Sequence, residues 1–538
     1  MIEREKYLIY ENNLRANLEK KKFRDSFQGD FFGKLNMMTF DYYTLSEVKL
    51  YWPLIGEGVL PKVIDRDVCI AILYKIIEER RMFDGYFSQI NSDSIGISRQ
   101  VYKIMLKSAK ENIPVEAIAQ RIERFRKGRK NSQIFVDLKN IIVEYRAVLS
   151  NLGVYDNSII YELYFNRLIK NSTYKDEVKN RILEFVDCED TFFLESISNV
   201  YDMGFESYGE MLNGLEQILN ELLNERRIDS NEICVIVPVL NDSLSRIIKD
   251  ISYRLGHNIK CISESKDIGN SDIAISALVA LSIYKNCEYI FNEDERFAFI
   301  KNIYKDKSPL DIRRNIDKYT NEIRKNFIEE NFPYEKKYRE EEFIKKFYKK
   351  VFHSNEEGIR FIESISEVFK SFKNISSLDN AGFLITDDFK IDFVKKYLGI
   401  FTSNKRKLEN TYCNPVILVT PDDYSNLEMV KKYKIVLDAK SGLFDDKVET
   451  ELDCELAYMD DKLLSNLTEE NLDGVYKDLL ETKIDKKVKK ILKNGWIENG
   501  YSSKESCQNI YLMYSEKSLR GFDQENKFYY RFLELTRK

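Results

Sequence analysis

The feature that most constrains the fold is a strand–helix–strand pattern near the middle of the chain. The run ICVIV (233–237) is apolar and β-rich, and Pro238 closes it. The next segment, DSLSRIIKDISYRLG, has apolar residues at helical spacing and ends at Gly256. NIKCIS (258–263) then begins a second strand. Two strands joined by one helix run parallel with a right-handed crossover, so we predict a parallel sheet here.

Other segments repeat this alternation at a larger scale. Only 8 Pro and 21 Gly occur in 538 residues, which favours long helices with few tight turns. Helical periodicity dominates two long stretches, at about 55–185 and 285–405, and residues 134–152 form the clearest helix, with Gly153 just beyond it. Further strands are predicted at 6–10, 35–40, 416–420, 434–438 and 509–515. The sequence therefore predicts an α/β fold whose sheet parts alternate with helical blocks.

Several of these segments, in this order, resemble a known family. The segments are LNMMTFDYYTLSEV, DRDVCIAILYKIIEE, LLNERRIDSNEICVIVPVL, KYKIVLDAKSGLF and NIYLMYSEKSLRG. They resemble superfamily 1 helicases, and more closely the AddB-like and RecC-like components of bacterial ATP-dependent deoxyribonucleases. The resemblance covers most of the chain. It implies the fold class α/β with two RecA-like parallel-sheet domains, each carrying a large helical insertion.

The resemblance also implies domain boundaries. The first RecA-like domain would be truncated, and residues 185–200 could be added to it. The second RecA-like domain would be split in sequence by its insertion. The predicted ranges are 1–54 for the first domain, 55–184 for helical insertion 1, 201–285 for the first part of the second domain, 286–405 for helical insertion 2, and 406–538 for the second part.

The phosphate loop of the family has no good counterpart. Such a loop needs G-x-x-x-x-G-K-[ST] between a strand and a helix, because backbone N–H groups cradle the phosphates and the hydroxyl holds Mg²⁺. The nearest string, GDFFGKL (29–35), is one residue short, has Leu35 at the hydroxyl position and runs into a predicted strand. The resemblance implies that the chain begins after the family's phosphate loop. We therefore predict no nucleotide-binding residue.

A second motif of the family is degenerate. Active relatives carry a His-x-x-Lys-Gly-Leu-Glu-type motif between two late strands. Here Ser425 and Asn426 stand at the lysine and glycine positions, Leu427 and Glu428 remain, and Asp422 stands near the histidine position. The segment before the last strand, SSKESCQ, lacks the arginine that would stabilise γ-phosphate charge. The resemblance thus implies no catalytic residue and no cofactor, and the family's nuclease domain is missing.

One short stretch is strongly basic and is the candidate nucleic-acid site. It contains a single acid, Glu123, and lies in the first predicted insertion, which in relatives lies beside DNA. Six cations could neutralise several phosphates, and binding would then weaken steeply with salt. A plain exposed helix end is an equally good interpretation. The six residues are Arg121, Arg124, Arg126, Lys127, Arg129 and Lys130.

The remaining composition limits the function classes. A net charge of −5 argues against a general DNA-coating protein, although residues 301–350 hold 15 Lys/Arg against 10 Asp/Glu and are a weaker candidate. The eight cysteines include no CxxC, so we predict no metal site and a reduced, cytoplasmic protein. The N-terminus lacks a signal-peptide core. The longest apolar stretch, 274–284, is too short to span a bilayer, so no membrane contact is expected.

These observations lead to one main hypothesis and two alternatives. The main hypothesis is a catalytically inactive helicase-like protein that binds nucleic acid, or scaffolds a nuclease or active helicase partner, in DNA processing, repair or phage defence. Any ATPase or nuclease activity would come from that partner. One alternative is a structural adaptor with no nucleic-acid contact. The other is an enzyme that borrows a phosphate loop from a partner chain.

Overall fold

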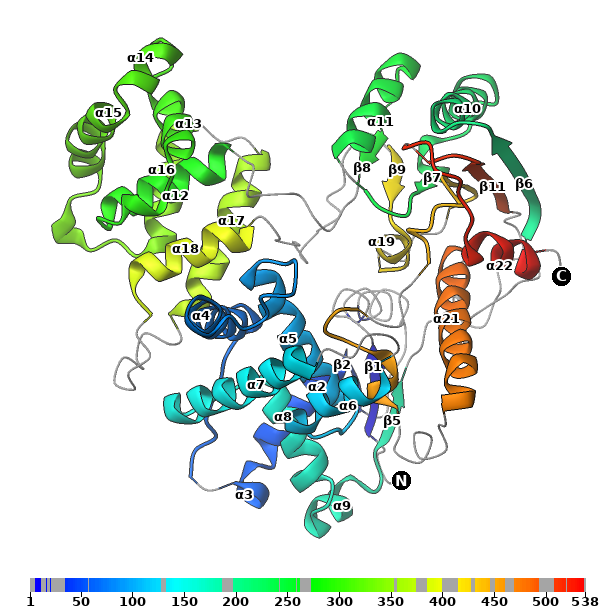
Figure 1. Cartoon of the computed structure of the whole chain (residues 1–538), viewed down its shortest axis with the longest axis horizontal. Helices are drawn as coiled ribbons and strands as arrows, with labels where there is room; N and C mark the ends of the chain where they lie inside the picture. Colours follow the sequence, from blue (N-terminus) through cyan, green and yellow to red (C-terminus); the bar gives the residue numbers. More distant parts are fainter. Residues whose placement is uncertain are drawn as a thin grey trace.

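The chain folds into a mixed α/β structure in which parallel sheets alternate with helical blocks (Figure 1). This confirms the predicted α/β class. The computed structural model describes residues 5–10, 16, 20, 34–56, 58–126, 132–185, 197–240, 242–257, 259–261, 272–352, 356–373, 385–398, 415–426, 431–445, 450–459, 469–492, 508–518 and 520–536.

The largest sheet has six strands in the order β6-β11-β10-β7-β9-β8, and every neighbouring pair is parallel. Five of the six strands were predicted, and β6 was not. A helical block separates β8 from β9 in the sequence, so the chain leaves the sheet and returns to it. The strands are β6 (Ile197–Phe205), β7 (Ile233–Ile236), β8 (Ile259–Cys261), β9 (Val416–Val419), β10 (Tyr433–Val436) and β11 (Gln508–Ser515).

Both faces of the six-stranded sheet are buried, as parallel strands require. On one face Ile233 and Val235 of β7 pack among the helices α10 (Tyr208–Asn220) and α11 (Asp242–Leu255). On the other face Cys234 and Ile236 pack in a second cluster. The helices of that second face are α19 (Pro421–Asn426), α21 (Glu469–Leu492) and α22 (Lys527–Thr536).

A smaller sheet lies near the N-terminus. Its three strands are parallel in the order β2-β1-β5, with Glu5 opposite Lys34 and Lys6 opposite Ile182. The strands β1 and β2 confirm the predicted strands near residues 6–10 and 35–40. The bounds are β1 (Glu5–Tyr10), β2 (Lys34–Thr39) and β5 (Ile182–Phe185).

The first helical block follows β2 and contains the predicted helix at 134–152. That helix, α7, ends at Leu152, and Gly153 adopts a left-handed φ of 63° that terminates it. A two-stranded parallel pair, β3 (Lys62–Val63) with β4 (Val154–Tyr155), joins the segment before α4 to the segment after α7. The helices are α2 (Phe40–Leu50), α3 (Trp52–Ile55), α4 (Arg66–Asp84), α5 (Ser94–Lys110), α6 (Ile118–Phe125), α7 (Ser132–Leu152), α8 (Asn157–Leu163) and α9 (Ser172–Val178).

The second helical block is built around the most apolar helix of the described chain. Ten of the thirteen residues of α12 are buried, so this helix is surrounded by others on all sides. The helices are α12 (Asp272–Tyr284), α13 (Glu293–Ile303), α14 (Pro309–Arg314), α15 (Ile316–Ile323), α16 (Glu340–Val351), α17 (Glu356–Phe372) and α18 (Asp387–Leu398).

The two helical blocks share one continuous hydrophobic core. Polar contacts at their junction reinforce it. The Tyr74 hydroxyl donates to Asp392 at 3.0 Å, and the Tyr397 hydroxyl donates to Asp67 at 2.7 Å. The predicted insertions are therefore packed against each other, which the sequence did not indicate.

The sheets and helices also refine the predicted domain boundaries. Residues 182–184 of β5 belong to the first sheet although they fall in the range assigned to helical insertion 1, and Phe185 falls in the segment that could be added to the first domain. Residues 197–200 belong to the second sheet through β6, not to the first. The helix α12 lies before the predicted boundary at residue 285 but packs against α13, α16, α17 and α18 of the second helical block. Among the described helices, none has both the length and the apolar character needed to cross a membrane.

One lysine lies inside the six-stranded sheet. Lys434 of β10 is fully buried, its Nζ donates to the Ile491 carbonyl near the end of α21 at 2.6 Å, and it lies 5.2 Å from the centre of the Tyr424 ring. Burial lowers the pKa of Lys434 to about 7, against a weak opposing effect from Cys234. The sheet therefore carries a buried group that titrates near neutral pH.

We expect Lys434→Met to change how stability depends on pH. An exposed lysine in the unfolded chain titrates near pH 10.4, so the unfolded state binds more protons than the folded state between about pH 7 and 10. The wild-type free energy of unfolding should rise with pH in this window relative to the variant. Urea unfolding of both proteins at pH 7, 8 and 9 measures this difference.

The control is Lys432→Met, which removes an exposed lysine beside the same strand. Its difference from wild type should stay constant across the same pH range. An equally constant difference for Lys434→Met would show that Lys434 is protonated throughout.

Candidate functional site

In parallel α/β sheets ligands bind at the carboxyl ends of the strands. At that end of β10 the chain turns sharply through Asp438, which has a φ of 61°, a left-handed conformation that is unusual for a residue other than glycine. Burial raises the pKa of the Asp438 carboxyl, while hydrogen bonds from Gln524 and Ser441 act in the opposite direction. A strained, half-buried carboxyl at this edge makes it the first place to look for a site.

Side-chain amides from the chain's own C-terminal part fill this edge. Gln524 Nε2 donates to Asp438 at 2.9 Å and to the Ser515 hydroxyl at 3.0 Å. Asn526 is buried, and its Nδ2 donates to the carbonyl oxygens of Ala439 and Ser441. These contacts hold the turn after β10 against the end of β11, so the described part of the edge is a closed polar network.

One cation beside this edge, Lys440, is already engaged. Lys440 Nζ forms a 2.9 Å ion pair with Glu516 and lies 4.0 Å from the centre of the Tyr514 ring. An ammonium group that already forms an ion pair with a carboxylate and contacts an aromatic ring is poorly placed to bind a phosphate. The described edge thus offers hydrogen bonding and a protonatable carboxyl, and Lys440 beside it already has a partner.

The degenerate motif lies in and beyond α19. Ser425 and Asn426 are the last two residues of this helix, and Leu427 and Glu428 lie outside the described residues. Asp422, near the family's histidine position, is exposed and accepts a hydrogen bond from Lys490 of α21 at 3.3 Å. The helix places Asp422 on the surface against α21.

The structure also locates the end of the string GDFFGKL. Its first five residues lie outside the described residues, while Lys34 and Leu35 are the first two residues of β2. This confirms that the string runs into a strand. In a phosphate loop these two positions would open a helix, whose N-terminal N–H groups point at the phosphate.

Three of the six predicted basic residues are described, and two of them bind the chain itself. Arg121 donates to the carbonyl oxygens of Ala457 at 2.9 Å and Met459 at 2.8 Å. Arg126 donates to the Glu451 carbonyl oxygen at 2.7 Å. Only Arg124 is exposed, with its guanidinium near the neighbouring Phe125 ring. Lys127, Arg129 and Lys130 lie outside the described residues.

The segment that these arginines hold, residues 450–459, is here called the strap. It comes from the second sheet part of the sequence but is packed in the shared helical core through Leu452, Leu456 and other buried residues. Glu455 of the strap receives Lys107 of α5 and Lys483 of α21. Burial opposes ionisation of Glu455, but the hydrogen bonds from these two lysines lower its pKa overall. The strap therefore links α5 and α6 to α21 through partly buried charge.

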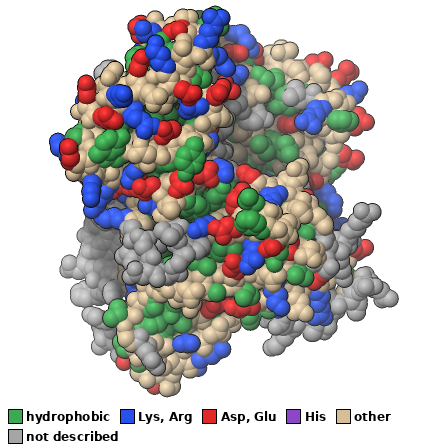
Figure 2. Space-filling view, turned by 60° about the vertical axis from the view of Figure 1, so that its left-hand side comes forward, with side chains coloured by type: hydrophobic (Ala, Val, Ile, Leu, Met, Phe, Trp, Pro, Cys, Tyr) green, Lys and Arg blue, Asp and Glu red, His purple; other side chains and the backbone are tan. Residues whose placement is uncertain are grey.

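The basic stretch 301–350 is mostly structural. Of its interleaved aromatic residues, Tyr319 and Phe332 are buried, and Tyr334 stacks on Tyr284 at 5.3 Å. On the face shown in Figure 2, Lys/Arg and Asp/Glu side chains are interspersed and do not gather by sign. A continuous phosphate-binding stripe is not visible on that face.

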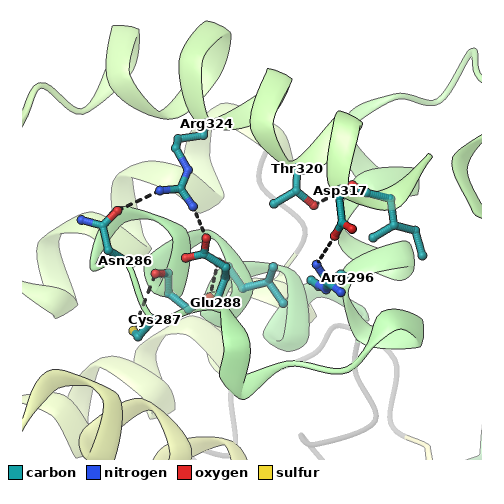
Figure 3. A network of polar contacts seen from close by, with 10 residues as sticks. Asn286, Cys287, Glu288, Arg296, Asp317, Thr320 and Arg324 are labelled. Carbon is teal, nitrogen blue, oxygen red and sulfur yellow. Dashed lines mark hydrogen bonds and ion pairs between the residues drawn. The ribbon is translucent and has the colours of Figure 1, made fainter.

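Two arginines of the second helical block form a polar network that the sequence did not reveal (Figure 3). Arg324 donates to Asn286 at 2.8 Å and to Glu288, and Arg296 donates to Asp317 at 2.8 Å. Arg324 begins a π-helical turn, Arg324–Glu329, which rotates its side chain toward Asn286 and Glu288. Arg324 thus joins the turn after α12 to the helical turn that follows α15, and Arg296 joins α13 to α15. These contacts engage both cations.

Neither a search for metal-binding groups nor comparison with known proteins points to a particular function. Within the described residues, no group of three or more His, Cys, Asp or Glu side chains is arranged to hold a metal ion. Comparison with protein-family models and with curated proteins finds no match.

We expect Arg121→Ala to loosen the strap. The change removes two charge-assisted hydrogen bonds to backbone carbonyls, which together stabilise the folded state by about 2 kcal/mol. Amide hydrogen exchange of residues 450–459 should therefore become faster, and the midpoint of urea unfolding should fall. Arg124→Ala is the matched control, because this arginine is exposed and contacts no strap carbonyl. Equal exchange rates in both variants would contradict the anchoring role.

Proposed function

We propose that this chain is a helicase-like scaffold without motor activity, which binds nucleic acid or holds a nuclease or helicase partner. The observation that carries the proposal is the chain order of the two larger parallel sheets. Each is interrupted in sequence by a helical block, between β2 and β5 and between β8 and β9. This order supports two RecA-like domains with helical insertions, as the resemblance implies.

The absence of motor activity is supported by the chemistry of the sheet edge. The turn after β10 is closed by Gln524 and Asn526, and Lys440 is paired with Glu516. Phosphoryl transfer depends on positioned cations and backbone N–H groups around the γ-phosphate. The described edge is filled with amides that satisfy the chain's own carbonyl and carboxyl groups.

Nucleic-acid binding would require exposed cations among the predicted basic residues. Arg124 is the exposed member of the described basic residues, and it lies on α6 in the first helical block. The alternative, an adaptor without nucleic-acid contact, is favoured by a specific observation. Arg121 and Arg126 are held by strap carbonyls, so they are not available to phosphates while the strap is in place.

If nucleic acid binds beside α6, Arg124→Glu weakens the binding. The change removes one phosphate contact and adds repulsion. The magnitude of the slope of log affinity against log salt concentration should therefore fall by about 1, which corresponds to one phosphate contact. Fluorescence anisotropy with a labelled single-stranded oligonucleotide at several salt concentrations measures both. Arg246→Glu, which makes the same charge change on the exposed face of α11, is the control. Equal affinities for wild type and Arg124→Glu, or no binding by either, would favour the adaptor.

The isolated chain is also expected not to hydrolyse ATP, with or without DNA. A variant with Lys34→Ala should behave like wild type in a fluorescent-nucleotide titration, because Lys34 opens β2 and does not open a helix. ATP hydrolysis by wild type that disappears in Lys34→Ala would overturn the proposal and restore a functional phosphate loop.

A further inference from the structure

The outer side of β6 is an open sheet edge. β6 pairs in parallel with β11 from Asn199 opposite Asn509 to Phe205 opposite Ser515. In the sheet order β6 is the end strand, and Figure 1 shows it at the outer side of β11. Among the strands of the described chain, none pairs with its other side. Within the described part of the chain, one row of backbone groups on β6 is therefore without a strand partner.

The register shows which backbone groups face outward. The N–H of Glu516 donates to the carbonyl oxygen of Phe205 at 2.9 Å, so Phe205 faces β11. In a parallel ladder the N–H and C=O of one residue point to the same side, and successive residues alternate. Tyr201 and Met203 therefore also face β11. Val200, Asp202 and Gly204 direct their N–H and C=O groups away from the sheet.

β6 carries few of the features that normally protect a sheet edge. Natural edge strands are short, or carry charged side chains (lysine above all), proline or a bulge. The opposite edge of the same sheet follows this rule, because β8 has three residues. β6 has nine, its sequence ISNVYDMGF contains neither lysine nor proline, and its one irregularity lies at the far N-terminal end. β6 has one charged residue, Asp202. An edge of this length and composition is suited to accept another strand.

The side chains beside the edge form two different surfaces. On one face Tyr201, which is 41% exposed, stacks on Tyr511 with ring centres 4.8 Å apart. On the other face Asp202 accepts a hydrogen bond from the Tyr529 hydroxyl. Gly204 lies against the Tyr514 side chain, and a Cβ added at this position would be only 2.6 Å from the Tyr514 hydroxyl oxygen. A strand added to β6 would meet aromatic surface on one side and a carboxylate on the other.

The charge of Asp202 argues against a second copy of this chain as the added strand. Antiparallel self-pairing that engages all three outward residues pairs Val200 with Gly204 and Asp202 with its own copy. Cα atoms in such a pair lie about 5.5 Å apart, and like charges directly opposite are destabilising. Among the described residues Asp202 has no ion-pair partner, and its contact is the neutral Tyr529 hydroxyl. A foreign strand with a lysine or arginine opposite Asp202 would supply one.

We propose that β6 is a docking site for an extended segment of a partner protein, which adds a seventh strand and places a basic side chain against Asp202. Backbone hydrogen bonds to Val200, Asp202 and Gly204 would supply affinity, and the Tyr201 and Asp202 surfaces would supply specificity. The inference rests on the scaffolding part of the proposed function and does not involve nucleic acid. Strand docking at β6 and nucleic-acid binding beside α6 can therefore be disproved independently.

The test uses three labelled synthetic peptides and the full chain. Each peptide has eight residues of alternating valine and threonine, one with a central lysine, one with a central glutamate, and one with the lysine and N-methylated backbone amides. In fluorescence anisotropy the lysine peptide should bind wild type at least about tenfold more tightly than the glutamate peptide. The N-methylated peptide should not bind, because it cannot complete the ladder.

Variants of the chain assign the contact to β6. Asp202→Lys should reverse the preference toward the glutamate peptide, whereas Asp250→Lys, the same charge change on exposed α11, should leave it unaltered. Val200→Pro should weaken both peptides, because it removes one outward N–H that β11 does not use. Circular dichroism checks that each variant is folded.

Several outcomes would overturn the inference. They are no binding of the lysine peptide, equal binding of the N-methylated peptide, and an unchanged charge preference in Asp202→Lys. A further contradicting outcome would come from analytical ultracentrifugation. A dimer of the wild-type chain that Tyr201→Lys dissociates would show that a second copy of this chain, and not a foreign segment, pairs with β6. Oligonucleotide affinity in Asp202→Lys should equal that of wild type, which separates this site from the one beside α6.

Discussion

The requirement that a parallel sheet be covered on both faces determines most of this structure. Alternate residues of β7 enter two separate cores, one under α10 and α11 and the other under α19, α21 and α22. The helices of the second face come late in the sequence, after the second helical block. The sheet can therefore be completed only when the chain returns from that block with β9, β10 and β11. Folding of the sheet and placement of the helical insertion are coupled for this reason.

The same requirement explains which strands could be predicted from the sequence. β7 and β9 are continuous apolar runs because they are buried on both faces, and both were predicted. β6 was missed because an edge strand needs no such run, and its sequence mixes Asn, Asp and Gly with apolar residues. β10 was predicted in spite of Lys434, whose burial nothing in its neighbours indicates. Helix α7 was predicted almost to the residue, because its apolar spacing and Gly153 agree.

The candidate site was less predictable because it depends on contacts between distant segments. Six cations in one stretch indicate a phosphate-binding surface, but the sequence does not show that carbonyl oxygens more than 300 positions away accept hydrogen bonds from Arg121 and Arg126. The strap contains the acids Glu451, Asp453 and Glu455, whose charge is opposite to that of the basic run. What could not be read was that backbone carbonyls, and not the acidic side chains, receive these arginines. Charge counts identify neither the partner atom nor the burial that fixes it.

Burial also gives the polar residues of this chain a common role. Arg121 and Glu455 each carry a charge that is costly to remove from water, and carbonyl oxygens or lysines of the same chain offset it. Lys434 is fully buried, its pKa is lowered to about 7, and its Nζ donates to the Ile491 carbonyl near the end of α21. Asp438 follows the same rule at the sheet edge through Gln524. Groups that could serve a nucleotide or phosphate are instead used to fix the strap, α21 and the turn after β10. The edge strand β6 still offers backbone hydrogen-bonding groups that no described strand pairs with. Exposed charged side chains such as Arg124, Arg246 and Asp250 also remain at the described surface.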